Sequence, residues 1–236
     1  MNRHRLGIAF LVAAAAASHS LAVGLRAEGE PPINCRPCGS SGDVVLMIGL
    51  PFEDYRARTE TRLWIEKHSV EAQRRLGGRP GQTVRVVTQY PASVAEFRRE
   101  VQRLADRCER IAYLGIISHG NAGYLQIGRD GVTGRNMEDA FGRGLGCVMA
   151  PDASVEIAGC NIGRGCSGAG FMLAAARLLL LRGGTITAPD SYVYGNAFLG
   201  VTPRPIRGDR ELQVSAGALH PRWTKGSERG PECGSR

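Results

Sequence analysis

The sequence predicts an α/β fold, a three-layer α/β/α sandwich around a mostly parallel sheet. Short apolar runs typical of buried strands alternate along the chain with segments of helical periodicity, which is the order that parallel sheets require. Two of these strands, residues 111–117 and 154–158, are separated by enough chain for a helical crossover. They are therefore expected to lie side by side and in parallel.

The elements follow from the pattern in chain order. In the first half we expect a strand at 44–49, a moderately amphipathic helix at 58–76 ended by the Gly- and Pro-rich segment 77–81, a strand at 83–88, a helix opened by Pro91, and the strand 111–117. In the second half we expect a turn and short extended piece at 120–128, a helix at 135–149, the strand 154–158, a buried apolar helix at 168–181, a strand at 185–188 and a last strand at 211–215.

The ends of the chain differ in composition from this α/β domain, which we place at residues 43–202. Residues 1–22 combine a basic start, an apolar stretch and a small-residue motif ending at Ala22, and they predict a cleaved signal peptide. An uncleaved anchor remains the alternative. Residues 23–42 form a Pro-, Gly- and Cys-rich leader, and 203–236 a partly disordered extension, with 221–236 expected to be disordered. The protein is thus predicted to be secreted, periplasmic or at the cell surface, with no integral membrane segment after signal removal.

The formal net charge of +8 does not indicate a nucleic-acid partner. Lys67 and Lys225 are the only lysines, and the arginines are interspersed with acids and not gathered on one stripe with aromatic residues. The glycines at 163–170 lack the lysine and the spacing of a phosphate-binding loop, so nucleotide binding is not predicted either. The sequence predicts no cofactor and no metal, and it leaves the oligomeric state open.

Seven cysteines in an exported chain predict disulfide bonds, and an odd number leaves at least one thiol unpaired. Cys35 and Cys38 have the spacing of a metal or redox motif, but no second ligand pair accompanies them. A structural disulfide is the better interpretation for them. Cys160 is expected to be the free thiol, and a disulfide between Cys160 and Cys166 is the alternative.

His119 and Cys160 each follow the end of a predicted strand. His119 is flanked by Gly120, Cys160 is preceded by Gly159, and 41 positions separate the two. Since catalytic groups of parallel α/β sheets collect at the carboxyl ends of the strands, we expect a cysteine–histidine dyad and hence a cysteine peptidase. Each residue also has a simpler interpretation: His119 as a loop histidine that ends a strand, and Cys160 as a buried core thiol.

The strand order and these two motifs resemble the caspase-like clan of cysteine peptidases. The likeness is strongest to an uncharacterised bacterial family of secreted caspase-like, CHAT-related domains. It is carried by the segments 117–128 and 155–161 and by the helix and strand that follow them. The resemblance implies a caspase-like sheet and a nucleophilic Cys160 with His119 as its acid–base partner. It also implies an oxyanion hole from the backbone N–H groups of Gly120 and Cys160.

In this clan, loops beside the dyad select a charged substrate residue before the scissile bond. Asp190 could receive an Arg or Lys side chain, and Arg56 or Arg164 an acidic one. We expect a weak preference for a basic residue. No third catalytic residue is required, and neither Asp130 nor Asp139 is assigned an orienting role.

The sequence therefore predicts an exported caspase-like cysteine endopeptidase that acts on a peptide or protein substrate. Self-processing is left open. The alternative is a non-catalytic caspase-like module that binds a partner or anchors a surface assembly, because a fold does not fix a function.

Overall fold

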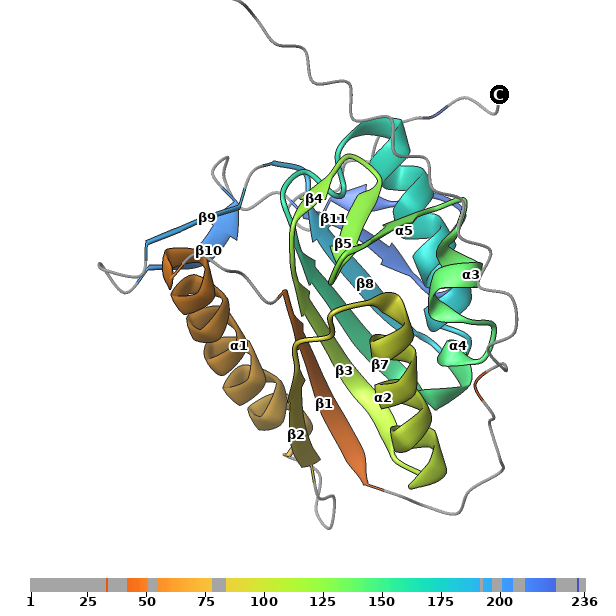
Figure 1. The fold of residues 1–236 in the computed structure, drawn as a ribbon. Helices are drawn as coiled ribbons and strands as arrows, with labels where there is room; N and C mark the ends of the chain where they lie inside the picture. The colour runs from red at the N-terminus through yellow and green to blue at the C-terminus, as the bar shows by residue number, and fades with distance from the viewer. Residues whose placement is uncertain are drawn as a thin grey trace, which may run out of the picture.

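A computed structural model of the chain shows a sheet with helices on both faces (Figure 1). It describes Ile33, residues 42–50, 55–77, 84–191, 193–196, 201–205 and 211–223, and Cys233. The predicted signal peptide and the Cys35–Cys38 pair lie outside these residues. Within the described part of the chain, no helix is both long and apolar enough to span a membrane.

The main sheet has seven strands in the order β12-β11-β8-β7-β3-β1-β2. Neighbouring strands from β8 to β2 are parallel, whereas β11 runs antiparallel to β8 and β12 antiparallel to β11. The strands are β1 Asp43–Gly49, β2 Val84–Gln89, β3 Arg110–Ile117, β7 Met149–Ala158, β8 Gly184–Pro189, β11 Glu211–Ser215 and β12 Arg222–Trp223. The predicted mostly parallel sheet is confirmed.

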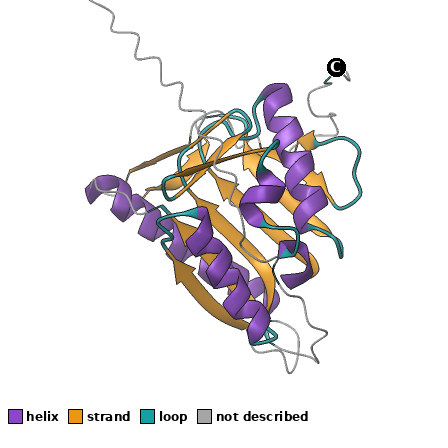
Figure 2. Cartoon of the chain, turned by 45° about the vertical axis from the view of Figure 1, so that its right-hand side comes forward, coloured by secondary structure: helices purple, strands orange, loops and turns teal. Residues whose placement is uncertain are grey.

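The helices form the two outer layers of the sandwich, as Figure 2 shows. Helix α1 covers one face, and the other four helices cover the opposite face. Their bounds are α1 Tyr55–Leu76, α2 Val94–Asp106, α3 Met137–Phe141, α4 Leu145–Val148 and α5 Gly165–Leu179. The chain is therefore the three-layer α/β/α sandwich that the sequence predicts.

Strand β1 illustrates why both faces are apolar. Val44, Leu46 and Ile48 pack in the core beneath α2 and α5, whereas Val45 and Met47 pack with Trp64 on the α1 side. Side chains alternate between the two faces of a strand, so a strand covered on both sides must be apolar throughout. This is the continuous apolar run seen in the sequence.

A small antiparallel sheet follows β3 directly and is more regular than the turn and extended piece predicted at 120–128. It consists of β4 Gly120–Asn121, β5 Tyr124–Ile127 and β6 Asp130–Thr133. It is fixed to the start of α2, where the Arg129 N–H donates to the carbonyl of Ala92 at 3.0 Å and the Val94 N–H to the Asp130 carboxylate at 2.8 Å. The chain after His119 is thereby attached to the body of the domain.

The predicted continuous helix at 135–149 is wrong, because the segment forms the two short helices α3 and α4. Gly142 separates them with φ +79°, a left-handed conformation that interrupts a helix. Gly144 lies against Ile33, a buried residue of the leader, and a methyl group on Gly144 would come 2.2 Å from the Ile33 carbonyl oxygen. Strand β7 begins at Met149, earlier than the predicted residue 154.

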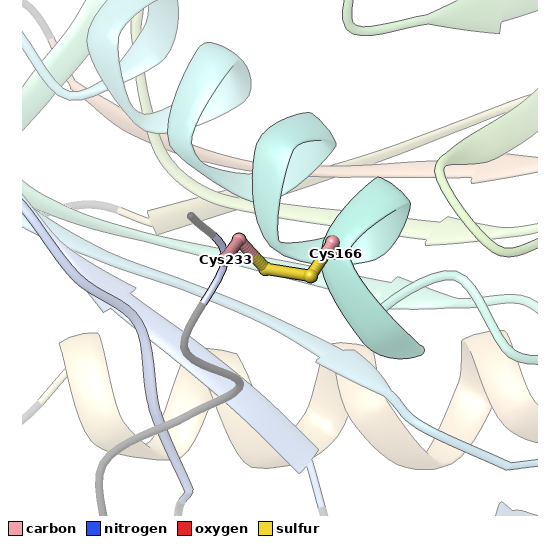
Figure 3. The surroundings of a disulfide bond; sticks show 2 residues. All are labelled: Cys166 and Cys233. Atoms are coloured by element: carbon pink, nitrogen blue, oxygen red, sulfur yellow. A yellow bond between two sulfur atoms is a disulfide. The ribbon is translucent and has the colours of Figure 1, made fainter. Parts of the chain in front are cut away.

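The sequence predicts that the α/β domain ends at residue 202. The main sheet continues beyond that residue, because β11 and β12 add two strands to it. A two-stranded sheet of β9 Val193–Asn196 and β10 Val201–Pro205, which the sequence does not predict, lies beside α1. Disorder throughout 221–236 is also wrong: Arg222–Trp223 form β12, and Cys233 is bonded to Cys166. The disulfide joins this part of the chain to α5 (Figure 3).

Candidate active site

The two strands that precede His119 and Cys160 are parallel neighbours in register. Ile117 pairs with Ala158, and the Ser118 N–H donates to the Ala158 carbonyl oxygen at 3.2 Å. His119 and Cys160 each lie two positions beyond that pair, at the carboxyl edge of the sheet. The structure thus brings the two strand ends together as the sequence predicts.

The His119 end is held from both sides. Ser118 is buried, and its hydroxyl donates to the carbonyl of Gln126 on β5. The Gln126 N–H in turn donates to the His119 carbonyl at 3.0 Å. The backbone of His119 is fixed between β3 and the small sheet, while its side chain is exposed.

Cys160 begins a tight turn between β7 and α5. Asn161 has φ +57° and its N–H donates to the Ser191 carbonyl at 2.9 Å. The Gly163 N–H donates to the Pro189 carbonyl at 2.8 Å. The end of β8 and the residues just after it thus hold the turn, and Cys160 within it is half-buried.

Cys160 is the free cysteine among the described residues, as the sequence predicts. Cys108 and Cys147 are disulfide-bonded, and Cys166 is bonded to Cys233. The alternative disulfide between Cys160 and Cys166 is therefore wrong. Local spacing favoured it, but the partner of Cys166 comes from 67 positions further along the chain.

The remaining predicted site residues lie at the same edge of the sheet. Gly120 opens β4 and is half-buried. Arg164 is exposed and precedes α5. Asp190, half-buried, stands between Pro189 and Ser191, the two residues whose carbonyls accept hydrogen bonds from the Cys160 turn.

The two aspartates that received no catalytic assignment have other places in the fold. Asp130 accepts the Val94 N–H with its carboxylate, which satisfies an otherwise unpaired N–H in the first turn of α2. Asp139 is exposed on the short helix α3. Asp130 thus has a structural role at a helix start, as its pattern of contacts indicates.

Sequence reasoning missed a polar network on the α1 face of the two dyad strands. Glu156 on β7 accepts the Tyr113 hydroxyl of β3 at 2.5 Å and contacts His68 Nδ1 on α1 at 3.1 Å. Trp64 stacks on the His68 ring with centroids 4.3 Å apart. An acid within the apolar strand 155–158 is the sequence signal that could have indicated it.

The network changes the acidity of its members. Burial, the largest single influence, would raise the pKa of the Glu156 carboxyl. The hydrogen bond and charge of His68, the Tyr113 hydrogen bond and the Arg75 charge together outweigh burial, so this pKa lies below its usual value. Burial, followed by the charge and hydrogen bond of Glu156, raises the pKa of Tyr113 well above its usual value. Glu156 is thus held as a carboxylate between β3, β7 and α1.

Ser191, also missed by sequence reasoning, carries a buried hydroxyl that finds no hydrogen-bond partner among the residues that the structure describes. Its own carbonyl accepts the Asn161 N–H of the Cys160 turn. Buried polar atoms are usually paired, because an unmade hydrogen bond costs free energy. The unpaired hydroxyl thus belongs to the residue whose carbonyl helps to hold the Cys160 turn.

The segment that holds these features corresponds to a known family. Residues 68–227, more than half of the chain, match the model of DUF4347, a domain of unknown function. The chain belongs to this family. The DUF4347 match begins within α1 and extends beyond β12, so it includes His119, Cys160 and both strands that carry them. No curated protein matches the chain.

Proposed function

We propose that this DUF4347 protein is an exported caspase-like cysteine endopeptidase with His119 and Cys160 as its catalytic dyad. The observation that carries the proposal is the register of β3 and β7, which sets the two strand ends side by side with a free cysteine on one of them. Parallel α/β sheets concentrate their chemistry at this edge. The other described cysteines are all in disulfide bonds. That Cys160 alone among them keeps a free thiol supports a chemical role for it.

The proposed reaction is acyl transfer to sulfur. The Cys160 thiolate attacks the scissile carbonyl after His119 takes the thiol proton, and His119 then gives a proton to the leaving amine. Water hydrolyses the resulting thioester and restores the thiol. The Gly120 and Cys160 N–H groups are assigned to the oxyanion, a role in which one donor contributes roughly 10²–10³ in rate.

Asp190 is proposed to favour a basic residue before the scissile bond. Asp190 stands between the two residues whose carbonyls hold the Cys160 turn, and this position supports the proposal. A carboxylate facing the substrate there would give an Arg or Lys side chain a charge-assisted hydrogen bond. Arg164, four positions after Cys160, is the candidate for the opposite preference. Self-processing would require a basic residue directly before the bond that is cleaved within this chain, and the chain is rich in arginine.

The test uses two fluorogenic peptides that differ only in having Arg or Asp before the scissile bond. The oxidised full chain should cleave the Arg peptide, and Cys160→Ala and His119→Ala should abolish cleavage. His220→Ala is the matched control, because His220 is also exposed but lies beyond β11, and it should keep wild-type activity. Cleavage of the Asp peptide alone would overturn the basic preference. Cleavage that persists in Cys160→Ala would favour the non-catalytic module. The same holds if neither peptide is cleaved and iodoacetamide does not alkylate the Cys160 thiol.

A further inference from the structure

The side chain of Ile162, two positions after Cys160, is completely buried between the two dyad strand ends. A methyl group placed on Gly120 would lie 2.4 Å from its Cγ1 and 2.7 Å from its Cδ1. A methyl group on Gly159 would lie 2.4 Å from the same Cδ1. Ile162 therefore fills the space between the residue after His119 and the residue before Cys160, and both of those positions are glycine.

The backbone of Ile162 is held on two further sides. Its carbonyl oxygen accepts the Gly123 N–H of the small sheet at 3.1 Å. A methyl group on Gly168 of α5 would lie 2.6 Å from that oxygen and 2.3 Å from the carbonyl carbon of Gly163. Since close packing at both sides leaves no room to shift, the Ile162 side chain has a fixed position between the strand ends.

We propose that Ile162 is a positioning residue that sets the separation of His119 and Cys160. It contacts neither substrate nor the reacting atoms, and it acts through Gly120 and Gly159, the direct neighbours of the dyad. The proposal rests on the proposed peptidase function. Proton transfer and attack depend steeply on distance, so loss of this spacer should lower reactivity more than it lowers stability.

The first variant is Ile162→Val, which removes Cδ1, the atom that faces both glycines. The control is Ile111→Val, the same change at an equally buried isoleucine near the amino end of β3. Both should destabilise the protein to a similar extent. Alkylation of Cys160 by iodoacetamide, followed from pH 5.5 to 8.5, should be slowed about ten-fold or more near pH 6.5 in Ile162→Val, since a displacement of about 1 Å costs up to roughly 10² in rate. It should be unchanged in Ile111→Val.

A second variant replaces the Cδ1 methyl group lost in Ile162→Val with a methyl group added at position 159. Gly159→Ala alone would collide with Cδ1 of Ile162, whereas in the double variant Gly159→Ala/Ile162→Val the added methyl group occupies the emptied space. The double variant should therefore alkylate faster than either single variant. A merely structural role would change only the unfolding free energy, in which two contacting residues couple whatever their role, and would leave the alkylation rate of all three variants at the wild-type value.

His119→Ala separates failure of this inference from failure of the proposed function. If it alkylates with the wild-type rate and pH dependence, the dyad itself is wrong. If it alkylates more slowly but Ile162→Val matches both wild type and Ile111→Val, the dyad stands and the positioning role is wrong. Additive effects in the double variant would also contradict the positioning role.

Discussion

The Cys166–Cys233 disulfide closes a loop of 67 positions that holds most of α5 and every strand from β8 to β12. No other cysteine lies between these two in the sequence, so no other disulfide shortens this loop in the unfolded chain. Loop-closure entropy for that length corresponds to about 4 kcal/mol at 25 °C. We therefore expect the double variant Cys166→Ser/Cys233→Ser to lose about 4 kcal/mol of unfolding free energy.

Urea denaturation without reductant measures this loss, with the fluorescence of buried Trp64 as the signal. The double variant is preferable to either single one because it leaves no new thiol to exchange with Cys160. The dependence of the free energy on urea should also steepen, since the unfolded chain exposes more surface without the bond. A loss below about 1 kcal/mol would refute the loop-closure reasoning.

Three further changes test the surroundings of the site. Glu156→Gln should cost about 1–3 kcal/mol at neutral pH because it weakens the hydrogen bonds with His68 and Tyr113. The pKa of Glu156 is lowered in the folded state, so its stabilising effect is present above the ordinary pKa of glutamate and is lost as the pH falls through the folded value. The difference between wild type and variant in urea titrations should accordingly shrink as the pH falls from the ordinary pKa of glutamate through the lowered folded value, and a difference that grows with acid would contradict this sign. Ser191→Ala should raise the unfolding free energy by up to about 1 kcal/mol, since it removes an unpaired buried hydroxyl, and a clear loss of stability would show that the hydroxyl is paired. Asp190→Asn should lower the specificity constant for the Arg peptide but not the alkylation rate of Cys160, and equal cleavage by both proteins would remove Asp190 from substrate recognition.

Continuous apolar strands and regular helices could be predicted from sequence, because they carry their own signals. Strand β3 and helix α2 repeat their apolar positions over many residues. Strand β12 has two residues, too few for any periodicity. The first half of β7 contains Asp152 with φ +54°, and its pairing with β3 shifts register there, so it does not look like a strand.

The candidate site divides in the same way. The adjacency of the strand ends that carry His119 and Cys160 could be predicted, because each of the two strands is recognisable by itself. The position of Ile162 could not be predicted, because its contacts with Gly120 and Gly159 form only when the two strand ends come together in the fold. The partner of Cys166 is likewise a property of the tertiary fold, because spacing alone does not determine disulfide connectivity.

The most direct test of the dyad is covalent labelling of Cys160 by a peptidyl acyloxymethyl ketone that ends in arginine. The rate should be measured by intact mass on the oxidised protein, with His220→Ala as the control. The account predicts one label per chain at Cys160, and a rate about 100-fold lower in His119→Ala, the contribution expected of one acid–base group. Labelling of His119→Ala at the wild-type rate, or the absence of label on Cys160, would contradict it.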